Sequence, residues 1–239
     1  MRYGDQVKLR APITALDGVV CFGRVGISPP AMAMCAEAGV ALTFCTEHGR
    51  FLARVSGFTP GNVLLRRAQY RAADDPAATA HLARSFLLGK IANARTAILR
   101  AARDRPDAPG VHRLHAAAHT LAQSLDALEH APDADTLRGI EGDAAATYFD
   151  AFDAMITNPD TCFAFRSRSR RPPLDPVNAL LSFLYAMLAH DVRAACESAG
   201  LDAAVGFLHR DRPGRPGLAL DLMEELRAPV ADRVALTLV

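Results

Sequence analysis

The chain has very few lysines and almost no net charge. Only two of its 27 basic residues are lysines, Lys8 and Lys90, and the others are arginines. Arginine forks pair well with phosphate, but such a bias also follows from genome composition. The formal net charge of the 239 residues is +1. The overall charge therefore does not indicate a nucleic-acid-binding protein.

The chain also lacks paired cysteine motifs and long apolar runs. Its five cysteines are an odd number and include no C-x-x-C pair, which argues against a disulfide framework and against a zinc knuckle. No apolar run approaches the roughly 20 residues of a membrane span. The N-terminus has no apolar core typical of a signal peptide. These absences predict a cytoplasmic protein with reduced thiols and no membrane-spanning segment.

Residues 1–58 predict a small β-rich domain. Alternating or apolar runs indicate strands, and a serine, two prolines and a closing glycine delimit one short helix. The sheet is expected to lack leading strands at its front. The expected strands are 7–10, 18–22, 40–45 and 51–55, the last two forming a hairpin, and the expected helix is 28–39.

Residues 59–239 predict a larger all-α domain, which makes the fold class α+β. A linker around Thr59-Pro-Gly61 separates the two domains. The run Asp175–Leu188 is expected to form a helix capped by Asn178. The ten residues after Asn178 carry no charge, so this helix has no face suited to water and is expected to be the central one. The C-terminal helices of the domain are expected to be missing. The other expected helices are 63–71, 76–103, 112–128, 135–156, the segment around 218–226, and one that begins near Pro229.

Glu141 falls on an apolar helical stripe, where a carboxylate needs a partner. The stripe includes Leu137, Ala144 and Tyr148 at three- and four-residue steps. Burying the carboxylate unpaired costs several kcal/mol, so it requires a metal, an arginine or a proton. Gly139 and Gly142 flank it, and each glycine inside a helix costs about 1 kcal/mol relative to alanine. This cost predicts that a backbone or a ligand approaches closely there.

Further candidate ligands follow in the last quarter of the chain. His209 ends an apolar run, and Asp221 and Glu224 are three residues apart, so both carboxylates share one helix face. An oxygen-rich site with one imidazole suits Mg²⁺ or Mn²⁺. The histidines at 112, 115 and 119 could form a zinc site on one helix, but without a nearby cysteine or acidic motif a partly exposed polar face is the favoured interpretation.

Four motifs together resemble a known family. They are Gly139-Ile-Glu-Gly142 with Tyr148-Phe149, Asp175-Pro-Val-Asn178 with the apolar run to Tyr185, Gly206-Phe-Leu-His209, and Asp221-Leu-Met-Glu-Glu225. Their order and spacing are similar to those of the CRISPR-associated integrase that inserts new spacers during adaptation. Gly18–Gly23 and Gly61–Tyr70 also resemble that family, in the branch that accompanies type I-C systems.

The resemblance implies a metal-dependent DNA integrase and endonuclease. It implies that Glu141, His209 and Glu224 are catalytic residues that bind Mg²⁺ or Mn²⁺, and Asp221 matches a further acidic position. It also implies a homodimer that binds double-stranded protospacer and repeat DNA and a small ferredoxin-like partner subunit. The arginines expected to contact DNA phosphates are Arg66, Arg67, Arg71, Arg166, Arg168 and Arg170.

Two alternatives remain at the level of sequence. A stand-alone nuclease for branched DNA would cut junctions without joining strands. A non-catalytic DNA-binding scaffold would follow if the shortened ends abolished activity, although the three intact ligands argue against it. The run Ala144–Ala146 also departs from the family pattern, which often has a polar residue there, so a local charge partner for Glu141 is expected to be absent.

Overall fold

A computed structural model describes residues 2–3, 6–55, 57 and 62–239. The chain divides into two compact units, residues 1–61 with 197–200, and residues 62–196 with 201–239. The boundary predicted between residues 58 and 59, and the linker at 59–61, lie outside the described residues. The α+β class is confirmed, because a small sheet near the N-terminus precedes a helical unit.

The first unit contains a three-stranded sheet and one helix. Strand β3 (Gly18–Phe22) pairs in parallel with β4 (Ala41–Cys45), and β4 pairs antiparallel with β5 (Phe51–Val55). Helix α1 (Pro29–Glu37) makes the crossover that a parallel pair requires. The expected hairpin and helix are therefore confirmed. The other elements of this unit are β1 (Arg2–Tyr3), β2 (Gln6–Val7) and the 3-10 helix η1 (Ile13–Ala15).

The strand predicted at residues 7–10 is wrong except for its first residue. Strand β2 ends at Val7 and pairs with β1. The next three residues are exposed and extend no sheet. Alternation of polar and apolar residues indicates a strand only where a neighbouring strand accepts its hydrogen bonds.

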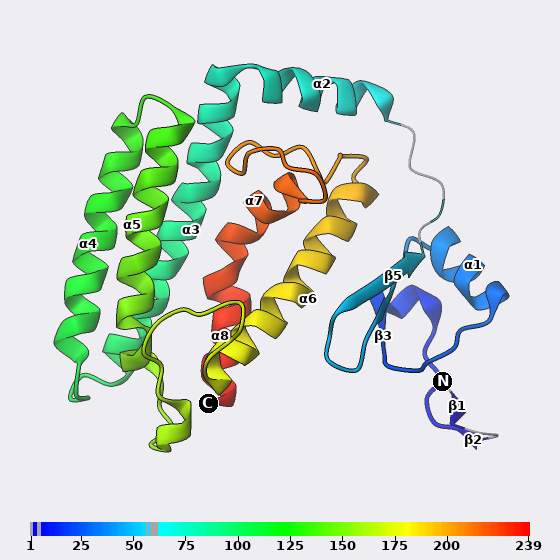
Figure 1. Cartoon of the computed structure of the whole chain (residues 1–239), viewed down its shortest axis with the longest axis horizontal. Helices are drawn as coiled ribbons and strands as arrows, with labels where there is room; N and C mark the ends of the chain where they lie inside the picture. Colours follow the sequence, from blue (N-terminus) through cyan, green and yellow to red (C-terminus); the bar gives the residue numbers. More distant parts are fainter. Residues whose placement is uncertain (1, 4–5, 56, 58–61) are drawn as a thin grey trace. The chain divides into compact units, whose positions relative to one another are not determined.

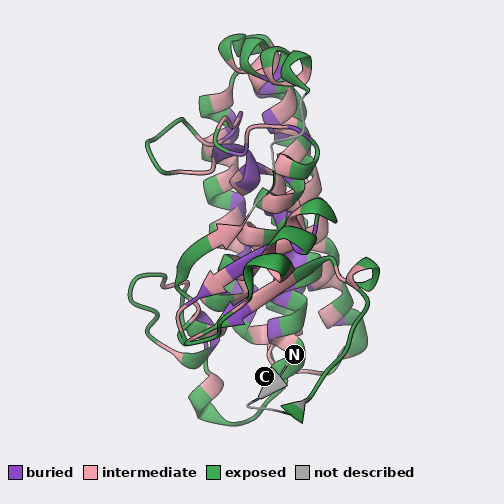
Figure 2. Ribbon diagram, turned by 90° about the vertical axis from the view of Figure 1, so that its right-hand side faces the viewer, coloured by how far each residue is buried: buried purple, intermediate pink, exposed green. Residues whose placement is uncertain are grey.

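The second unit is helical. Figure 1 shows α3, α4 and α5 side by side, and leucine and isoleucine side chains fill the space between them. The residues that α3, α4 and α5 turn toward one another are buried, and Figure 2 shows buried and exposed stretches along the helices of this unit. The helices are α2 (Val63–Asp74), α3 (Pro76–Asp104), α4 (Val111–His130), α5 (Ala134–Phe152), α6 (Pro176–Ser198), α7 (Gly217–Leu226) and α8 (Arg233–Leu238), with η2 (Asp153–Met155), η3 (Thr161–Phe163) and the π-helical turn η4 (Arg227–Asp232).

Helix α6 is only partly the central helix that the sequence predicts. Val177 and Leu181 are fully buried, whereas the Phe183 side chain is 41% exposed. The cap also differs, because the Asp175 carboxylate accepts the backbone N–H of Asn178 at 2.7 Å and Asn178 lies inside the helix. Among the described residues, α6 is long and apolar enough to cross a membrane by length and composition alone. Core helices of soluble proteins pass the same test, so this is weak evidence.

The helix expected to begin near Pro229 is instead a continuation of α7. Proline has no N–H, so Pro229 cannot donate to the Glu225 carbonyl four residues earlier. The chain passes through the π-helical turn η4 before α8 begins. The Asn93 amide of α3 donates to the Glu225 carbonyl at 2.8 Å. Such turns inside α-helices occur frequently at functional sites.

Candidate active site

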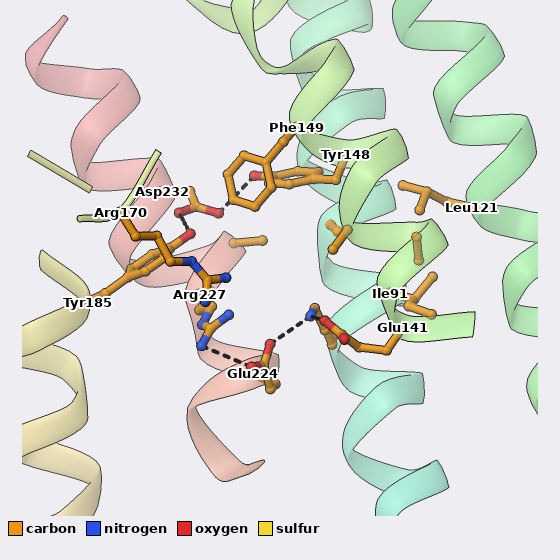
Figure 3. A pocket seen from close by; sticks show the side chains of 15 residues that line it. Ile91, Leu121, Glu141, Tyr148, Phe149, Arg170, Tyr185, Glu224, Arg227 and Asp232 are labelled. Atoms are coloured by element: carbon orange, nitrogen blue, oxygen red, sulfur yellow. Dashed lines mark hydrogen bonds and ion pairs between the residues drawn. The ribbon is translucent and has the colours of Figure 1, made fainter. Parts of the chain in front are cut away.

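A pocket opens among α3, α4, α5, α6, α7 and η4, and Arg170 of the loop before α6 also lines it. Its wall combines apolar residues, such as Ile91 and Phe149, with a concentration of charged groups and two tyrosines (Figure 3). Charged side chains that face such a cavity interact strongly, because the surrounding protein lowers the local dielectric constant. The polar residues that line it are Lys90, Glu141, Tyr148, Arg170, Tyr185, Glu224, Arg227 and Asp232.

Lys90 joins the two predicted metal-binding glutamates. Its ammonium forms an ion pair with Glu141 Oε1 and lies 2.8 Å from Glu224 Oε2. Figure 3 shows Glu141 and Glu224 on opposite sides of these contacts, on α5 and α7. Arg227 lies one turn after Glu224 and contacts its other oxygen at 2.9 Å. Glu141 therefore has the cationic partner that its place on an apolar stripe requires. This partner is a lysine of another helix, α3, and not a residue next to Glu141 on α5.

Glu224 is almost completely buried and carries its charge because of these cations. Its side chain is 3% exposed. Burial raises the pKa of the Glu224 carboxyl, but the opposing effect of Lys90 and Arg227 is larger, so the pKa lies below its ordinary value. Oε2 has its ion pair with Lys90 but no contact with hydrogen-bond geometry in the described part of the chain. This oxygen is thus a buried acceptor turned toward the pocket.

Asp221 positions His209 and uses all of its hydrogen-bonding capacity to do so. Its Oδ1 accepts the His209 backbone N–H at 2.9 Å and lies 2.6 Å from His209 Nδ1. Its Oδ2 accepts the backbone N–H groups of Phe207 and Leu208. Because Asp221 is fully buried, this arrangement favours a positioning role over the metal-binding role considered for it. With Nδ1–H donating to Asp221, the Nε2 lone pair of His209 is left to bind a cation.

The loop that carries His209 is fixed by close packing and by α5. A Cβ placed on Gly206 would lie 2.7 Å from the backbone carbon of Gly217 and 2.9 Å from Asp221 Oδ2, so only glycine allows this approach. Arg138 of α5 donates from Nε to the Leu208 carbonyl at 2.6 Å. Since α5 also carries Glu141, one helix fixes the position of the glutamate and of the histidine loop.

The buried carboxylate of Asp232 also lines the pocket. Asp232 accepts the hydroxyl of Tyr148 at 3.0 Å and that of Tyr185 at 2.6 Å. Burial raises the Asp232 pKa to about 6, although both tyrosines and the nearby arginines oppose the rise. The tyrosine pKa values are raised well above 10, first by burial and then by Asp232. Tyr148 is a core residue, as its helical spacing predicts.

Glu141, Glu224 and His209 have the donor atoms that Mg²⁺ or Mn²⁺ binds. Two carboxylates and one imidazole nitrogen suit these ions, and the buried Oε2 of Glu224 is an acceptor suited to a cation. In the described part of the chain, no three acidic, histidine or cysteine side chains already form a group that could hold an ion. Lys90 lies between the two carboxylates, so the residues fit the metal only if its ammonium moves.

The arginines predicted to contact DNA fall into two environments. Arg67, Arg71 and Arg166 are exposed, and Arg170 is exposed at the pocket. Arg66 is half-buried on α2. Arg168 instead donates to Asn178 Oδ1 at 2.7 Å and to Ser182 Oγ at 3.1 Å, and it stacks over the Tyr185 ring. These contacts favour a structural role for Arg168, and the DNA contacts of all six arginines remain predictions.

Two other sequence expectations resolve simply. A Cβ on Gly139 or Gly142 would meet no heavy atom within 4 Å among the described residues, so no other backbone approaches there, and the close approach of a ligand stays a prediction. The three histidines of α4 are exposed along one side of that helix. In the portion of the chain that the structure describes, they are part of no group of three side chains that could hold a metal ion.

Sequence reasoning missed three residues of the site, namely Lys90, Arg227 and Asp232. Each lies on a helix face that otherwise packs inward, which is the signal that identified Glu141. Lys90 stands between Leu87 and Ile91 on α3, and Asp232 stands beside Ala228 and Ala231. Arg227 follows Glu224 by three residues, which is the spacing of a helical ion pair.

The fold and the site define an α+β protein whose helical unit carries two glutamates bridged by a lysine at a pocket. His209, which Asp221 orients, is not among the residues that line this pocket. The chain belongs to a family described as CRISPR associated protein Cas1, whose model matches residues 1–239. It is 54% identical over 232 residues to "CRISPR-associated endonuclease Cas1 1" of Chlorobaculum tepidum, covering 97% of this chain and 68% of that protein. It is 52% identical over 241 residues to "CRISPR-associated endonuclease Cas1 2" of Rhodospirillum rubrum, with the same coverage of 97% and 68%.

Solved structures share the fold. A Cas1 protein from Thermotoga maritima matches with a TM-score of 0.77 at 23% identity, over 95% of this chain and 69% of that chain. A casposase bound to integration product matches with a TM-score of 0.76 at 24% identity, over 93% of this chain and 60% of that one. A Cas6-RT-Cas1–Cas2 complex matches with a TM-score of 0.74 at 27% identity, over 94% of this chain and 24% of that one.

Proposed function

We propose that this chain is a divalent-metal-dependent DNA endonuclease and integrase that inserts spacer DNA into a CRISPR array. The observation that carries the proposal is the convergence of Glu141 and Glu224 on one cation, with His209 held in place by Asp221. Endonuclease activity is what the names of its relatives state. The branch that accompanies type I-C systems remains the subtype that we expect.

Glu141, Glu224 and the Nε2 atom of His209 would hold Mg²⁺ or Mn²⁺. The bound ion would polarise the scissile phosphate and stabilise the charge that develops in an in-line displacement. Asp221 keeps the proton on Nδ1 of His209 and so directs the Nε2 lone pair outward. In the displacement, a 3′-hydroxyl forms one P–O bond while another P–O bond breaks, so no covalent enzyme intermediate is required. Water in place of the hydroxyl gives endonuclease cleavage.

The arginines at and beyond the pocket would bind the DNA backbone. Arg170 is exposed at the pocket, where a phosphate near the glutamates would be within reach. Arg67, Arg71 and Arg166 are exposed and would contribute contacts along the duplex. Each phosphate that such a residue neutralises steepens the loss of affinity with salt. A chain that acts on chromosomal DNA in this way would work in the cytoplasm.

The proposed partners follow from the family and one neighbour. The Cas6-RT-Cas1–Cas2 complex joins a Cas1 protein with Cas2, as its name states, and its matching chain is 27% identical to this one. We therefore expect this chain to bind a small ferredoxin-like partner subunit of the Cas2 kind. Dimerisation through the β domain is expected from the family resemblance.

A strand-joining experiment tests the function. Labelled short duplex DNA with free 3′-hydroxyls is mixed with a supercoiled plasmid bearing the repeat, the partner subunit and Mn²⁺ or Mg²⁺. Label is expected in the plasmid with the native chain and not with Glu141→Gln. Asp143→Asn changes an exposed carboxylate on the same helix and is the matched control, with unchanged joining. Cutting of branched DNA without joining would favour a stand-alone nuclease, and DNA binding without either reaction would favour a scaffold.

A further inference from the structure

We propose that Lys90 competes with the divalent cation for Glu141 and Glu224 and thereby limits the metal affinity of the site. This inference rests on the proposed function, because it concerns the same carboxylates. Its physical basis is that one ammonium contacts both glutamates. Its contact with Glu224 Oε2 is 2.8 Å, and it also forms an ion pair with Glu141 Oε1.

The local charges exclude an arrangement with both the ammonium and the metal between the carboxylates. Two glutamates carry two negative charges, and Lys90 with Arg227 balances them. A divalent cation added between the same oxygens would face the ammonium at contact distance. Repulsion between like charges is strong where water is excluded, and the side chains of Lys90 and Glu224 are 13% and 3% exposed. Either the ammonium or the metal therefore bridges the glutamates at one time.

The structure provides a place for the displaced ammonium. Lys90 lines the pocket, and a lysine stem has four rotatable methylene groups that let its head move without moving the helix. Arg227 is less able to move, because its guanidinium stacks over the Tyr185 ring at 5.0 Å while it pairs with Glu224. The metal would thus displace the Lys90 ammonium from the glutamates, and Arg227 would keep its contact with Glu224.

Mn²⁺ binding by three purified chains tests the competition directly. Affinity is measured by electron paramagnetic resonance of free Mn²⁺ at fixed pH and salt, in the absence of DNA. Lys90→Met removes the charge and keeps the length, and it is expected to bind Mn²⁺ about tenfold or more tightly than the native chain. Lys90→Arg keeps the charge and is expected to bind no more tightly than the native chain. Circular dichroism confirms that each variant is folded.

A second measurement uses the native chain and so avoids any folding defect. Lys8 and Lys90 are the only lysines, so amine acylation followed by peptide mass spectrometry reports on Lys90 with Lys8 as an internal reference. Saturating Mn²⁺ is expected to increase the acylation rate of Lys90 severalfold and to leave that of Lys8 unchanged. Mg²⁺ is expected to act in the same direction at higher concentration.

The outcomes separate this inference from the proposed function. Equal or weaker Mn²⁺ binding by Lys90→Met, with native binding intact, would overturn the competition and leave the metal-dependent function standing. Continued protection of Lys90 at saturating Mn²⁺ would overturn it in the same way. Absence of Mn²⁺ binding by both the native chain and Lys90→Met would overturn the competition together with the metal dependence of the function.

Discussion

At the scale of single residues, the pocket wall contains two buried carboxylates with opposite electrostatic environments. Glu224 has Lys90 and Arg227 beside it, and its pKa is lowered despite burial. Asp232 has two tyrosine hydroxyls and more distant arginines, and burial raises its pKa to about 6. A full positive charge in contact thus offsets desolvation, whereas neutral hydrogen-bond donors offset only part of it.

The raised pKa of Asp232 predicts a specific pH dependence of stability. The folded state holds the proton more tightly than the unfolded state, whose carboxyl pKa is 3.8, so the contribution of this group to stability falls as pH rises through about 6. Asp232→Asn lacks this titration. The free energy of unfolding of the native chain, relative to that of Asp232→Asn, is expected to fall by on the order of 1 kcal/mol between pH 5 and pH 7.5. Urea unfolding at both pH values measures it, and parallel behaviour of the two chains would contradict it.

The contact between Asp221 and His209 predicts a single tautomer of the imidazole. With the proton on Nδ1, the Nε2 nitrogen of the neutral ring is expected to show the ¹⁵N chemical shift of an unprotonated ring nitrogen. Asp221→Asn is expected to shift His209 toward the Nε2–H tautomer. It is also expected to cost about 1–3 kcal/mol of stability, because three backbone N–H groups lose a charged acceptor. An unchanged ¹⁵N spectrum in the variant would show that Asp221 does not set the tautomer.

At the scale of elements, the π-helical turn between α7 and α8 depends on a contact from another helix. Pro229 cannot donate to the Glu225 carbonyl, and Asn93 of α3 donates to it instead. The turn places Arg227 and Asp232 in the pocket wall. Helix α3 also carries Lys90, so it contributes both a charged residue of the site and a contact that stabilises the turn.

This contact predicts energetic coupling between Asn93 and Pro229. Asn93→Ala is expected to destabilise the native chain by about 1–2 kcal/mol, because a carbonyl loses its donor. In a Pro229→Ala background, the alanine N–H can donate to the same carbonyl, so Asn93→Ala is expected to cost less. Denaturant unfolding of the four chains of this double-mutant cycle measures the coupling. Additive effects would indicate that the amide does not substitute for the missing N–H.

At the scale of the whole molecule, local patterns predict the elements better than the contacts between them. Helical periodicity and caps identify α3 and α4 to within two residues at each end, because those signals lie within each helix, whereas α5 ends at Phe152, four residues before the predicted end. Asn178 shows the limit, since the sequence predicts it as the cap, whereas the Asp175 carboxylate accepts the Asn178 backbone N–H and is the cap in the structure. The strand expected at 7–10 fails for the same reason, because a strand depends on a neighbour elsewhere in the chain.

In the candidate site, too, local sequence patterns predict single residues but not the contacts between helices. The position of Glu141 on an apolar stripe predicts that it needs a cation, and this prediction uses only neighbouring residues of the sequence. The neighbouring residues do not identify that cation, because Lys90 comes from another helix and reaches Glu141 and Glu224 only through the packing of α3 against α5 and α7. Motif resemblance connects Glu141, His209 and Glu224 across the chain, but it gives no information about Lys90 or Asp232.

The central claim is that Glu141, Glu224 and His209 bind one divalent cation. Crystals of the native chain soaked in Mn²⁺ and measured at a wavelength where manganese scatters anomalously test it most directly. We predict one anomalous peak bounded by these three side chains, with the Lys90 ammonium moved away from Glu224, and no such peak in Glu141→Gln. An anomalous peak elsewhere, or none at Mn²⁺ concentrations that support strand joining, would contradict the account.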